Sequence, residues 1–443
     1  MEVLEIIGKC CKDVKIFTPN IEEAALATLY RIAESKAYDG AKIRIMPDVH
    51  QGVGDSVIGF SCPINLEKGY VNPQTVGCDL GCTVSLWLYN KPISDDKLAE
   101  FEHKIRKNIP FGFSINDKTK IDVKYLIKSF NKAINKLVSK HPILAEYAIS
   151  FTKEKDLENW CLRIGMDYGM FLKSIGSVGG GNHFVEYDAN EELGKFGVCV
   201  HCGSRNLGQK VFKYWDKIAK SLCVSKEEMR LLTDKVKEKN TDKRKLKEEL
   251  DEAKKEYLKD RIPNFLVGEH LYRYLIDICV AQAYARLNHE IIHSQISEIY
   301  RKLSDGGKCV EEIYTTHNYI DMDDIILRKG AVRAYEGELL IIPFNMRDGI
   351  SICEGKSNDD WNCTAPHGCG RLLSRSKAKE TLNVDEFKKQ MTDANIYTTT
   401  ADASTLDEAP NAYKPMDEIV KLIEPTVNIK YFMKPKINIK AAE

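Results

Sequence analysis

The chain has no long hydrophobic run and no excess of either charge. None of its apolar segments approaches the roughly 20 residues that a membrane-spanning helix needs, so we expect no span and no membrane partner. Lysine plus arginine and aspartate plus glutamate number 65 each. A polyanion must therefore bind a local basic patch, because the chain as a whole offers it no attractive field. Internal repeats and low-complexity linkers are also missing.

A signal peptide is missing as well. Residues 1–17 carry six charged side chains, which interrupt the apolar stretch that a secretory leader requires. The 14 cysteines therefore do not indicate a disulfide framework, because reduced thiols and metal ligands are the usual roles of cysteine in a chain that is not secreted. We expect a soluble, cytoplasmic protein.

The length and the 43% hydrophobic content allow a large buried core. Residues 1–45 predict a small α/β unit, in which Asn20 caps a helix over 21–36 and a strand follows over 41–46. Helical patterns and strand-like apolar runs follow along the chain, the helices at 95–175 and 211–300 and the strands at 196–200, 312–316 and 427–440. The sequence thus predicts an α/β (α+β) fold and a single large domain over residues 1–443.

A densely charged segment at residues 225–261 interrupts the second helical block. Leu246, Leu250, Ala253 and Tyr257 lie at helical spacing and form a narrow apolar stripe. Such a stripe is typical of a helical hairpin on the protein surface. Because the signs of its charges alternate, the segment reads as a solvated face rather than as an RNA-binding arm.

The densest cluster of chemically active side chains follows three consecutive glycines, Gly179 to Gly181. Glycines permit close approach of a ligand to the backbone. Asn182, His183 and Glu186 come directly after them. The strand predicted at 196–200 then delivers His201 to a Gly-Ser-Arg turn that ends at Arg205. These residue types predict a metal-dependent, phosphate-handling enzyme.

Two earlier segments carry weaker signals. Asp48 and His50 follow the strand predicted at 41–46, where a catalytic acid and a turn-capping carboxylate are equally compatible with the sequence. Asp79 and Cys82 are three residues apart and can direct an oxygen and a sulfur at one divalent ion. Taken alone, that spacing is more often structural. Cys78 is expected to be a small buried hydrophobic residue.

Two later histidines stand in similar contexts. His317 follows the strand-like run at 312–316 and precedes Asn318. A lone histidine of this kind is usually a hydrogen-bonded polar residue and only sometimes a ligand. His367 lies in a glycine-rich loop ahead of Arg371 and Arg375, a placement that suits contact with a nucleotide phosphate.

Seven short motifs occur along the chain in a fixed order. They are Val-Gly-x-Asp-x-x-Cys (76–82), Gly-Asn-His-Phe-x-Glu (181–186), His-x-Gly-Ser-Arg (201–205), His-Asn (317–318), Arg-Lys-Gly-Ala (328–331), His-Gly-x-Gly-Arg (367–371) and Ala-Tyr-Lys (412–414). Any one of them can arise by chance. Together they resemble the RtcB-type RNA-splicing ligases, over nearly the whole chain from the Met-Pro-Asp-Val-His of residues 46–50 to Lys440.

The resemblance implies a 3′-phosphate/5′-hydroxy nucleic acid ligase that acts in tRNA splicing or RNA repair. Such an enzyme joins an RNA 3′-phosphate or 2′,3′-cyclic phosphate to a 5′-hydroxyl, with GTP and two Mn²⁺ ions as cofactors. The fold implied is one domain with β-sheets around a central dimetal site, flanked by helices and the charged hairpin. The implied metal ligands are Asp79, Cys82, His183, His201 and His317, with the Cys82 thiolate bridging the two ions.

The resemblance also assigns the nucleotide and RNA contacts. His367 would be the nucleophile that takes GMP as a phosphoramidate. The implied nucleotide-binding residues are Asn182, His183, Phe184, Val185, Glu186, His317, Asn318, Pro343, Phe344, Asn345, Met346, His367, Gly368, Cys369, Gly370, Tyr413 and Lys440. The implied phosphate contacts are Arg205, Lys329, Arg371 and Arg375. The small activator protein archease is a candidate partner.

The sequence departs from the family pattern near the expected nucleotide. The usual Pro-Gly-Ser-Met-Gly loop carries Phe344 and Asn345 in place of its two small residues, and Cys202, His289 and Cys369 are further replacements. Two alternatives therefore stay open. One is a divergent paralogue that guanylylates or caps 3′-phosphate ends without joining tRNA exons. The other is a non-enzymatic, metal-stabilised RNA-binding protein, against which the retained His367 argues.

Overall fold

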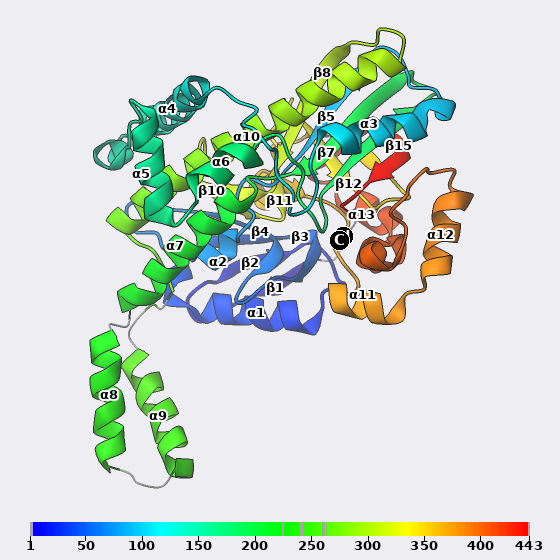
Figure 1. Cartoon of the computed structure of the whole chain (residues 1–443). Helices are drawn as coiled ribbons and strands as arrows, with labels where there is room; N and C mark the ends of the chain where they lie inside the picture. Colours follow the sequence, from blue (N-terminus) through cyan, green and yellow to red (C-terminus); the bar gives the residue numbers. More distant parts are fainter. Residues whose placement is uncertain (1–2, 224–225, 240–242, 259–261, 263, 442–443) are drawn as a thin grey trace.

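Two β-sheets, with helices on their outer sides, make up the body of the protein (Figure 1). The computed structural model describes residues 3–441 apart from 224–225, 240–242, 259–261 and 263. A two-stranded sheet of β11(Ala331–Arg333) and β14(Thr364–Pro366) accompanies the two large ones. The predicted α/β class is confirmed. In the part of the chain that the structure describes, no helix is both long and apolar enough to cross a membrane.

The first large sheet has six strands in the order β1-β2-β3-β4-β10-β9. Their bounds are β1(Leu4–Ile6), β2(Asp13–Ile16), β3(Lys42–Gln51), β4(Val57–Pro63), β10(Ile326–Lys329) and β9(Asn318–Ile320). Only β2 and β3 pair in parallel, and α1(Glu23–Glu34) makes the crossover between them. Ala25, Leu29 and Ile32 line the buried face of this helix at helical spacing.

Two details of this N-terminal unit differ from the sequence prediction. Asn20 does not cap α1, because its side chain donates to Glu418 Oε1 at 2.7 Å, and the helix begins two residues later than predicted. The strand does not end at Met46 either. It continues to Gln51 through a register shift between Ile45 and His50, and such a bulge tolerates Pro47, which has no N–H to donate.

The second large sheet has seven antiparallel strands in the order β12-β13-β15-β6-β7-β5-β8. Their bounds are β12(Leu339–Pro343), β13(Ile350–Gly355), β15(Val427–Ile439), β6(Phe184–Asn190), β7(Lys195–Cys202), β5(Thr83–Tyr89) and β8(Cys309–Thr316). The strands predicted at 196–200, 312–316 and 427–440 are therefore confirmed. The last of them, β15, returns from the C-terminal end of the chain to pair with β6 at the middle of the sheet.

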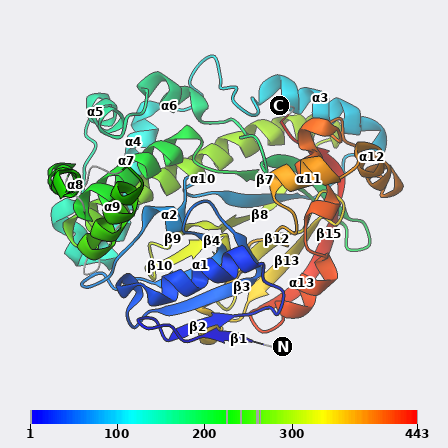
Figure 2. The same cartoon turned by 90° about the horizontal axis from the view of Figure 1, so that it is seen from below.

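The helices cover the two sheets. The α-helices of the body after α1 are α2(Pro73–Val76), α3(Leu98–Asn108), α4(Val123–Lys140), α5(Glu154–Ile164), α6(Tyr168–Ser174), α7(Asn206–Cys223), α10(Glu269–Leu303), α11(Arg375–Thr381), α12(Val384–Asp393) and α13(Met416–Leu422). Short 3₁₀ helices lie at Lys36–Tyr38, Asp95–Lys97, Pro142–Tyr147, Asp359–Trp361, Ala403–Glu408 and Pro410–Ala412. The 35-residue α10 runs across the molecule between the sheets and α4 to α6, as Figure 2 shows. It is buried along much of its length, so it joins the core beneath both sheets.

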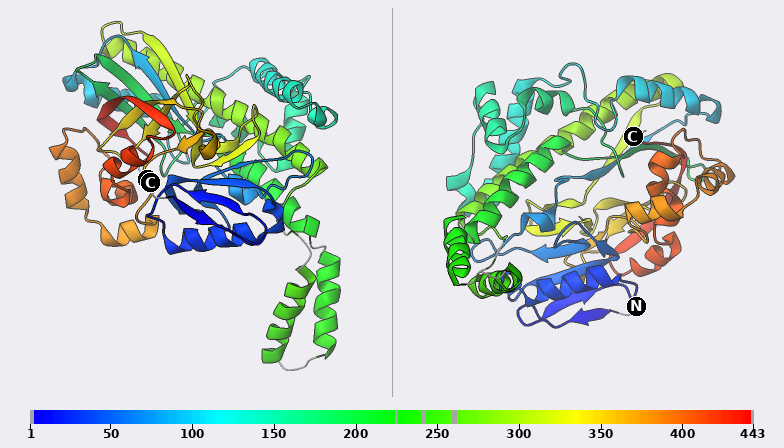
Figure 3. Two further views of the ribbon diagram at one scale, coloured as in Figure 1. Left: turned by 180° about the vertical axis from the view of Figure 1, so that it is seen from behind. Right: turned by 60° about the horizontal axis from the view of Figure 1, so that its bottom comes forward.

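Two further helices project from the body as a hairpin (Figures 1 and 3). They are α8(Lys226–Lys239) and α9(Lys243–Leu258), and they pack against each other. Leu246, Leu250 and Ala253 are half-buried, as the predicted apolar stripe requires. Residues 225, 240–242 and 259–261 of the predicted hairpin segment lie outside the described residues.

Candidate active site

Four neighbouring strands of the second sheet end at one common edge. Adjacent strands in the order β6-β7-β5-β8 run in opposite directions. The start of β6, the end of β7, the start of β5 and the end of β8 therefore meet. The four implied ligands at these ends are His183 just before β6, His201 near the end of β7, Cys82 just before β5 and His317 just after β8. Strand order alone thus gathers them from positions up to 235 residues apart.

The gathered side chains lie within ligand distance of one another. Cys82 Sγ is 3.4 Å from His183 Nε2 and 3.2 Å from His201 Nε2. His201 Nε2 is in turn 3.2 Å from His317 Nε2, and Asp79 Oδ2 is 3.0 Å from His183 Nε2. The ligand atoms of Cys82, His183 and His201 all lie within 4.8 Å of one another. The structure therefore brings together all five residues predicted as metal ligands.

The protonation states of the cluster suit a divalent cation. His201 Nδ1 donates to the carbonyl oxygen of Asn182 at 3.1 Å, which leaves the Nε2 lone pair directed at the cluster. Burial lowers the pKa of His201 and of His317 well below the ordinary value, so both imidazoles are in the neutral, ligating form. Burial and Asp79 raise the pKa of the Cys82 thiol, whose proton a bound cation would displace.

The carboxylate and the glycine beside it complete the fit. Burial alone would raise the pKa of Asp79, but His183 lowers it below the ordinary range, so the group is an anionic oxygen ligand. A Cβ at Gly203 would lie 2.4 Å from Asp79 Oδ1, so only glycine leaves room for this carboxylate. Imidazole, thiolate and carboxylate ligands together fit a transition-metal centre.

His367 lies against the same cluster and is held by an aspartate. Its Nδ1 is 2.6 Å from Asp48 Oδ2, and its backbone N–H donates to the same oxygen at 3.1 Å. Asp48 is fully buried, and its Oδ1 has no partner among the described residues. Because the carboxylate accepts the Nδ1 proton, His367 Nε2 carries a lone pair. The rings of His367 and His317 are 4.9 Å apart between centroids.

Asp48 is a further residue of the candidate site, whose role the sequence left undecided. It lies inside β3 at the bulge, not in a strand-exit loop, and it meets His367 across 319 positions of sequence. Gly370 passes directly over it with φ +72°, and a Cβ at Gly370 would lie 2.2 Å from the Asp48 carbonyl oxygen. The glycine at position 370 therefore allows the His367 loop to pack closely on β3. The available signal was the Asp-x-His spacing at the end of an apolar strand.

A cavity of about 920 Å³ opens beside His367. Of the residues predicted for metal, nucleotide or phosphate contact, its lining includes Asn182, Phe184, Glu186, His201, His317, Asn318, Lys329, Pro343, Phe344, Asn345, Met346, His367, Gly368, Cys369, Gly370, Arg371, Arg375, Tyr413 and Lys440. Val185 does not line it, because its side chain is packed in the core beneath the sheet. Arg205 lies outside it too, donating to Ser177 Oγ and the Gly112 carbonyl oxygen.

A buried carboxylate, Glu408, organises the cations of this cavity. It pairs with Arg371 at 3.3 Å, Arg375 at 2.5 Å and Lys440 at 3.3 Å. It also accepts the hydroxyl proton of Tyr413 at 2.7 Å. Burial would raise the pKa of Glu408, but Lys440 and the two arginines lower it below the ordinary value. Sequence reasoning missed Glu408, although it stands four residues before the Ala-Tyr-Lys motif.

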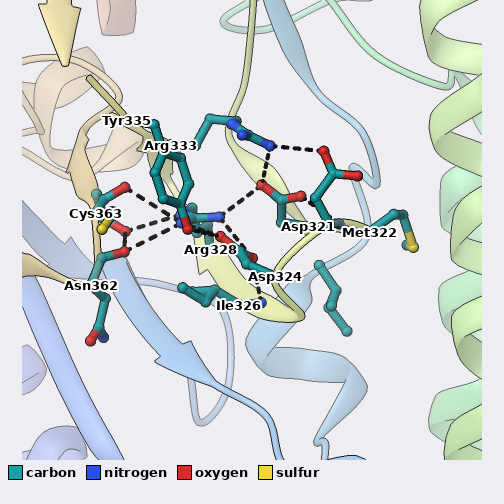
Figure 4. Close-up of polar contacts among 12 residues, drawn as sticks. Asp321, Met322, Asp324, Ile326, Arg328, Arg333, Tyr335, Asn362 and Cys363 are labelled. Atoms are coloured by element: carbon teal, nitrogen blue, oxygen red, sulfur yellow. Dashed lines mark hydrogen bonds and ion pairs between the residues drawn. The ribbon is translucent and has the colours of Figure 1, made fainter. Parts of the chain in front are cut away.

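Lys329 reaches the cavity from a strand that is fixed by a buried arginine. Figure 4 shows Arg328 among Asp321, Asp324 and the backbone at Asn362 and Cys363. Its two carboxylate contacts are both 3.0 Å, and Arg333 shares Asp321 at 2.9 Å. The Lys329 side chain runs over Gly77, where a Cβ would lie 2.1 Å from Lys329 Nζ. Burial lowers the pKa of Lys329, because it disfavours the charged ammonium group. An anion bound beside Lys329 would favour the charged form.

Glu186 lines the cavity and forms a buried acidic pair with Asp188 on the same strand, β6. Asn438 on β15 donates to Glu186 on β6, as the register of the two strands requires. Asp188, two residues along the same face, is fully buried, and neither of its oxygens has a partner among the described residues. Burial raises the pKa of Glu186 to about 7 and that of Asp188 well above its ordinary value, so this pair retains a proton.

The divergent loop between β12 and β13 uses its two unusual residues differently. Phe344 is buried and packs near Phe432, with ring centroids 6.2 Å apart. Asn345 closes its own turn: Oδ1 accepts the backbone N–H groups of Arg347 and Asp348, and Nδ2 donates to Asp348 Oδ2 at 2.7 Å. Both residues line the cavity, but the Asn345 amide is already engaged within the loop.

Cys78 and two histidines of α10, His289 and His293, lie near the residues described above. The expectation that Cys78 is buried is wrong. The chain turns at Gly77 with φ +91°, and Cys78 is exposed and lines the cavity. His293 is buried: it stacks on Trp87 and contacts Ser85 Oγ, whose other imidazole partner is His289. His289 Nε2 donates to the carbonyl oxygen of Cys202, the residue after His201.

Comparison with known proteins agrees with this geometry. A family model described as tRNA-splicing ligase RtcB matches residues 31–441. RNA-splicing ligase RtcB of Escherichia coli K12 is 26% identical, with 96% of this chain and 97% of that protein covered. The tRNA-splicing ligases RtcB of Nanoarchaeum equitans and Aeropyrum pernix are 27% and 25% identical, each with 85% of this chain and 83% of the relative covered. Because the family model spans the strand that carries Asp48, the gathered ligands and the His367 loop, the chain belongs to the RtcB family.

Proposed function

We propose that this protein is a GTP- and Mn²⁺-dependent RNA ligase. It joins an RNA 3′-phosphate or 2′,3′-cyclic phosphate to a 5′-hydroxyl through a GMP adduct of His367, in tRNA splicing or RNA repair. The observation that carries the proposal is the arrangement of His367: it is held by Asp48 at 2.6 Å and faces His317 inside a 920 Å³ cavity. Such a cavity accommodates a nucleotide. Membership of the RtcB family supports the same activity.

The residues around His367 suit nucleophilic attack on phosphorus. Asp48 keeps the proton on Nδ1 and leaves the Nε2 lone pair free. Nε2 forms a bond to the α-phosphorus of GTP while the bond to the pyrophosphate oxygen breaks. The positive charge that develops on the imidazole is stabilised by the buried Asp48 carboxylate, as a buried acid stabilises a catalytic histidine elsewhere.

The metal ions would be held by Asp79, Cys82, His183, His201 and His317. When bound, they supply positive charge that neutralises the phosphates and orients them for in-line displacement. Cys82 would be the ligand shared by the two ions, since its Sγ lies within 3.4 Å of the Nε2 atoms of His183 and His201. A bridging thiolate partly offsets the repulsion between two dications.

The remaining cavity residues divide into a base wall and a phosphate wall. Phe184, Glu186 and Tyr413 offer aromatic and carboxylate contacts to the guanosine, and Lys440 closes the same end. Lys329, Arg371 and Arg375 supply cations for the nucleotide and RNA phosphates. The engaged side chain of Arg205 fits a supporting role behind the site better than a direct phosphate contact. We place the reaction in the cytoplasm, with archease as a candidate activator.

The test is covalent labelling with radioactive GTP and Mn²⁺, read by denaturing electrophoresis. The wild type is expected to retain label, and His367→Ala is expected to lose it while keeping its metal content and its unfolding temperature. Label retained by the variant would remove His367 as the nucleophile. Adding RNA with a 3′-phosphate and a 5′-hydroxyl then separates a ligase, which forms joined product, from a paralogue that caps ends, for which the Phe344 and Asn345 loop is the supporting observation.

A further inference from the structure

The helical hairpin follows directly in the chain after α7, a helix that lines the main cavity. Phe212, Asp216 and Lys220 of α7 line that cavity, and α8 begins three residues after α7 ends. The hairpin then projects away from both sheets, as Figures 1 and 3 show. A ligand that extends out of the cavity past α7 therefore reaches the side of the molecule from which the hairpin projects.

The hairpin adds no buried core to the protein. None of the described side chains of α8 and α9 is buried, and their packing is confined to the half-buried seam between the two helices. Ordering two helices costs conformational entropy that a well-buried core would normally offset. Since this hairpin stabilises little beyond itself, its exposed surface is the feature that needs an explanation.

The charges of the hairpin are segregated along its length. Among the side chains that the structure describes, those of residues 235–247 at the far end include four basic and one acidic, whereas those of 227–234 and 248–257 include two basic and eight acidic. The alternating signs that predicted a merely solvated face conceal this division. It emerges only when the chain folds back and places the end of α8 beside the start of α9.

Four lysines with described side chains define the hairpin tip: Lys235, Lys237, Lys245 and Lys247. All four are exposed, and none forms an ion pair with a residue that the structure describes. Nearer the body, by contrast, Arg230 and Asp234 lie within ion-pair distance, and Tyr257 donates to Glu228. The cations at the tip therefore keep their charge available to an external anion.

The length of the hairpin limits what that anion can be. A 14-residue helix extends about 21 Å, which is more than twice the distance of about 8 Å over which salt screens exposed charges. The tip thus cannot attract a mononucleotide into the cavity. Its charges act only on a large polyanion that touches the tip and the cavity at once.

We propose that the hairpin tip binds the sugar–phosphate backbone of the RNA whose end lies in the cavity. This inference rests on the proposed function, which supplies RNA as the substrate. Lysines contact phosphates without reading the base sequence, so the tip selects for RNA length and shape. The acidic part of the hairpin, between the tip and the body, disfavours close contact there, which suits a folded RNA that touches the protein at two separated places.

The test compares two variants that lose the same charge. One carries Lys235→Gln, Lys237→Gln, Lys245→Gln and Lys247→Gln at the tip. The matched control carries Lys118→Gln, Lys124→Gln, Lys128→Gln and Lys132→Gln, four exposed lysines in and beside α4. Affinity is measured against salt concentration for a folded RNA long enough to span the hairpin, and for an oligonucleotide too short to do so.

For the long RNA, the tip variant is expected to bind at least roughly tenfold more weakly, with a slope of log affinity against log salt reduced by about 2 to 4. The control variant and the short oligonucleotide are expected to show no such change. An unchanged slope in the tip variant, or an equal loss in the control, would overturn the inference and leave an acidic protein as the partner to seek. GTP labelling of the wild type, measured in parallel, tests the proposed function separately. Absence of label would contradict the proposed function, but it would not change the comparison of salt slopes between the two variants.

Discussion

At the scale of single residues, the site depends on proton positions that neighbouring side chains fix. His367 and His201 each donate from Nδ1 to an oxygen, of Asp48 and of the Asn182 backbone respectively. Each therefore presents an unprotonated Nε2 to the cavity or the metal cluster. Removing one acceptor changes which ring nitrogen holds the proton, and so changes the chemistry without changing the fold.

Asp48→Asn is expected to slow GMP labelling by roughly 100-fold or more, because an amide can donate to Nδ1 and so leave the proton on Nε2. Metal content and unfolding temperature should stay near those of the wild type. The measurement is the single-turnover labelling rate. A rate within a few-fold of the wild type would make Asp48 a packing residue only.

Cys82→Ser is expected to lose more metal than Asp79→Asn, as measured by metal analysis after dialysis. Cys82 Sγ contacts two imidazoles, while the Asp79 carboxylate contacts one of them, so loss of the sulfur weakens binding of two ions and loss of the charge weakens one. Equal losses from the two variants would count against a bridging thiolate.

The buried pair Glu186 and Asp188 predicts a pH dependence of stability. Both pKa values are raised in the folded state, so the folded protein holds protons that the unfolded chain releases. The stabilisation is fully present below the ordinary pKa values of the two groups, 4.5 for Glu186 and 3.8 for Asp188, and is lost as the pH rises through about 7 for Glu186 and higher still for Asp188. Each retained proton lowers the unfolding free energy by about 1.4 kcal/mol per pH unit.

Asp188→Asn is expected to flatten this dependence and to be more stable than the wild type at alkaline pH. An asparagine is neutral at every pH, so it has no proton to release as the pH rises. Denaturant unfolding across the pH range measures the effect, and parallel curves for the two proteins would exclude the retained proton.

At the scale of elements, two residues of the loop joining β12 to β13 have different expected roles: Asn345 holds the turn together, and Phe344 forms part of the cavity wall. Asn345→Ser is expected to lose turn hydrogen bonds worth about 1–3 kcal/mol of unfolding free energy and to leave the GTP/ATP labelling ratio unchanged. Phe344→Gly with Asn345→Ser opens the wall and is expected to shift that ratio by roughly one to two decades. Because removing a buried ring costs about 3–5 kcal/mol, labelling is measured well below the unfolding temperature of the double variant. Equal GTP/ATP ratios in the wild type and both variants would show that Phe344 and Asn345 affect packing and not nucleotide choice.

At the scale of the whole molecule, strand order assembles the site. β15 carries Asn438 and leads to Lys440, and it reaches the centre of the second sheet only by pairing with β6, some 250 residues earlier. The chain has no net charge, yet the cavity concentrates Lys329, Arg371, Arg375 and Lys440, and the hairpin places four more lysines outside it. Polyanion binding is therefore local, as the equal charge totals require.

The sequence by itself determined which residue types stand at the ends of the strands. Apolar runs predicted β7, β8 and β15, and the apolar stripe predicted α8 and α9, while the five implied metal ligands and His367 came from the family resemblance of the ordered motifs. These are local properties, because side-chain periodicity and glycine placement depend on neighbours in the chain. Only the tertiary structure decided which ends meet. Asp48 reaches His367 across 319 positions, Glu408 gathers Arg371, Arg375 and Lys440, and Asn345 turns its amide back into its own loop. Such contacts follow from strand order and from a bulge at Pro47, and a local pattern cannot encode either, because both depend on which distant strands pair.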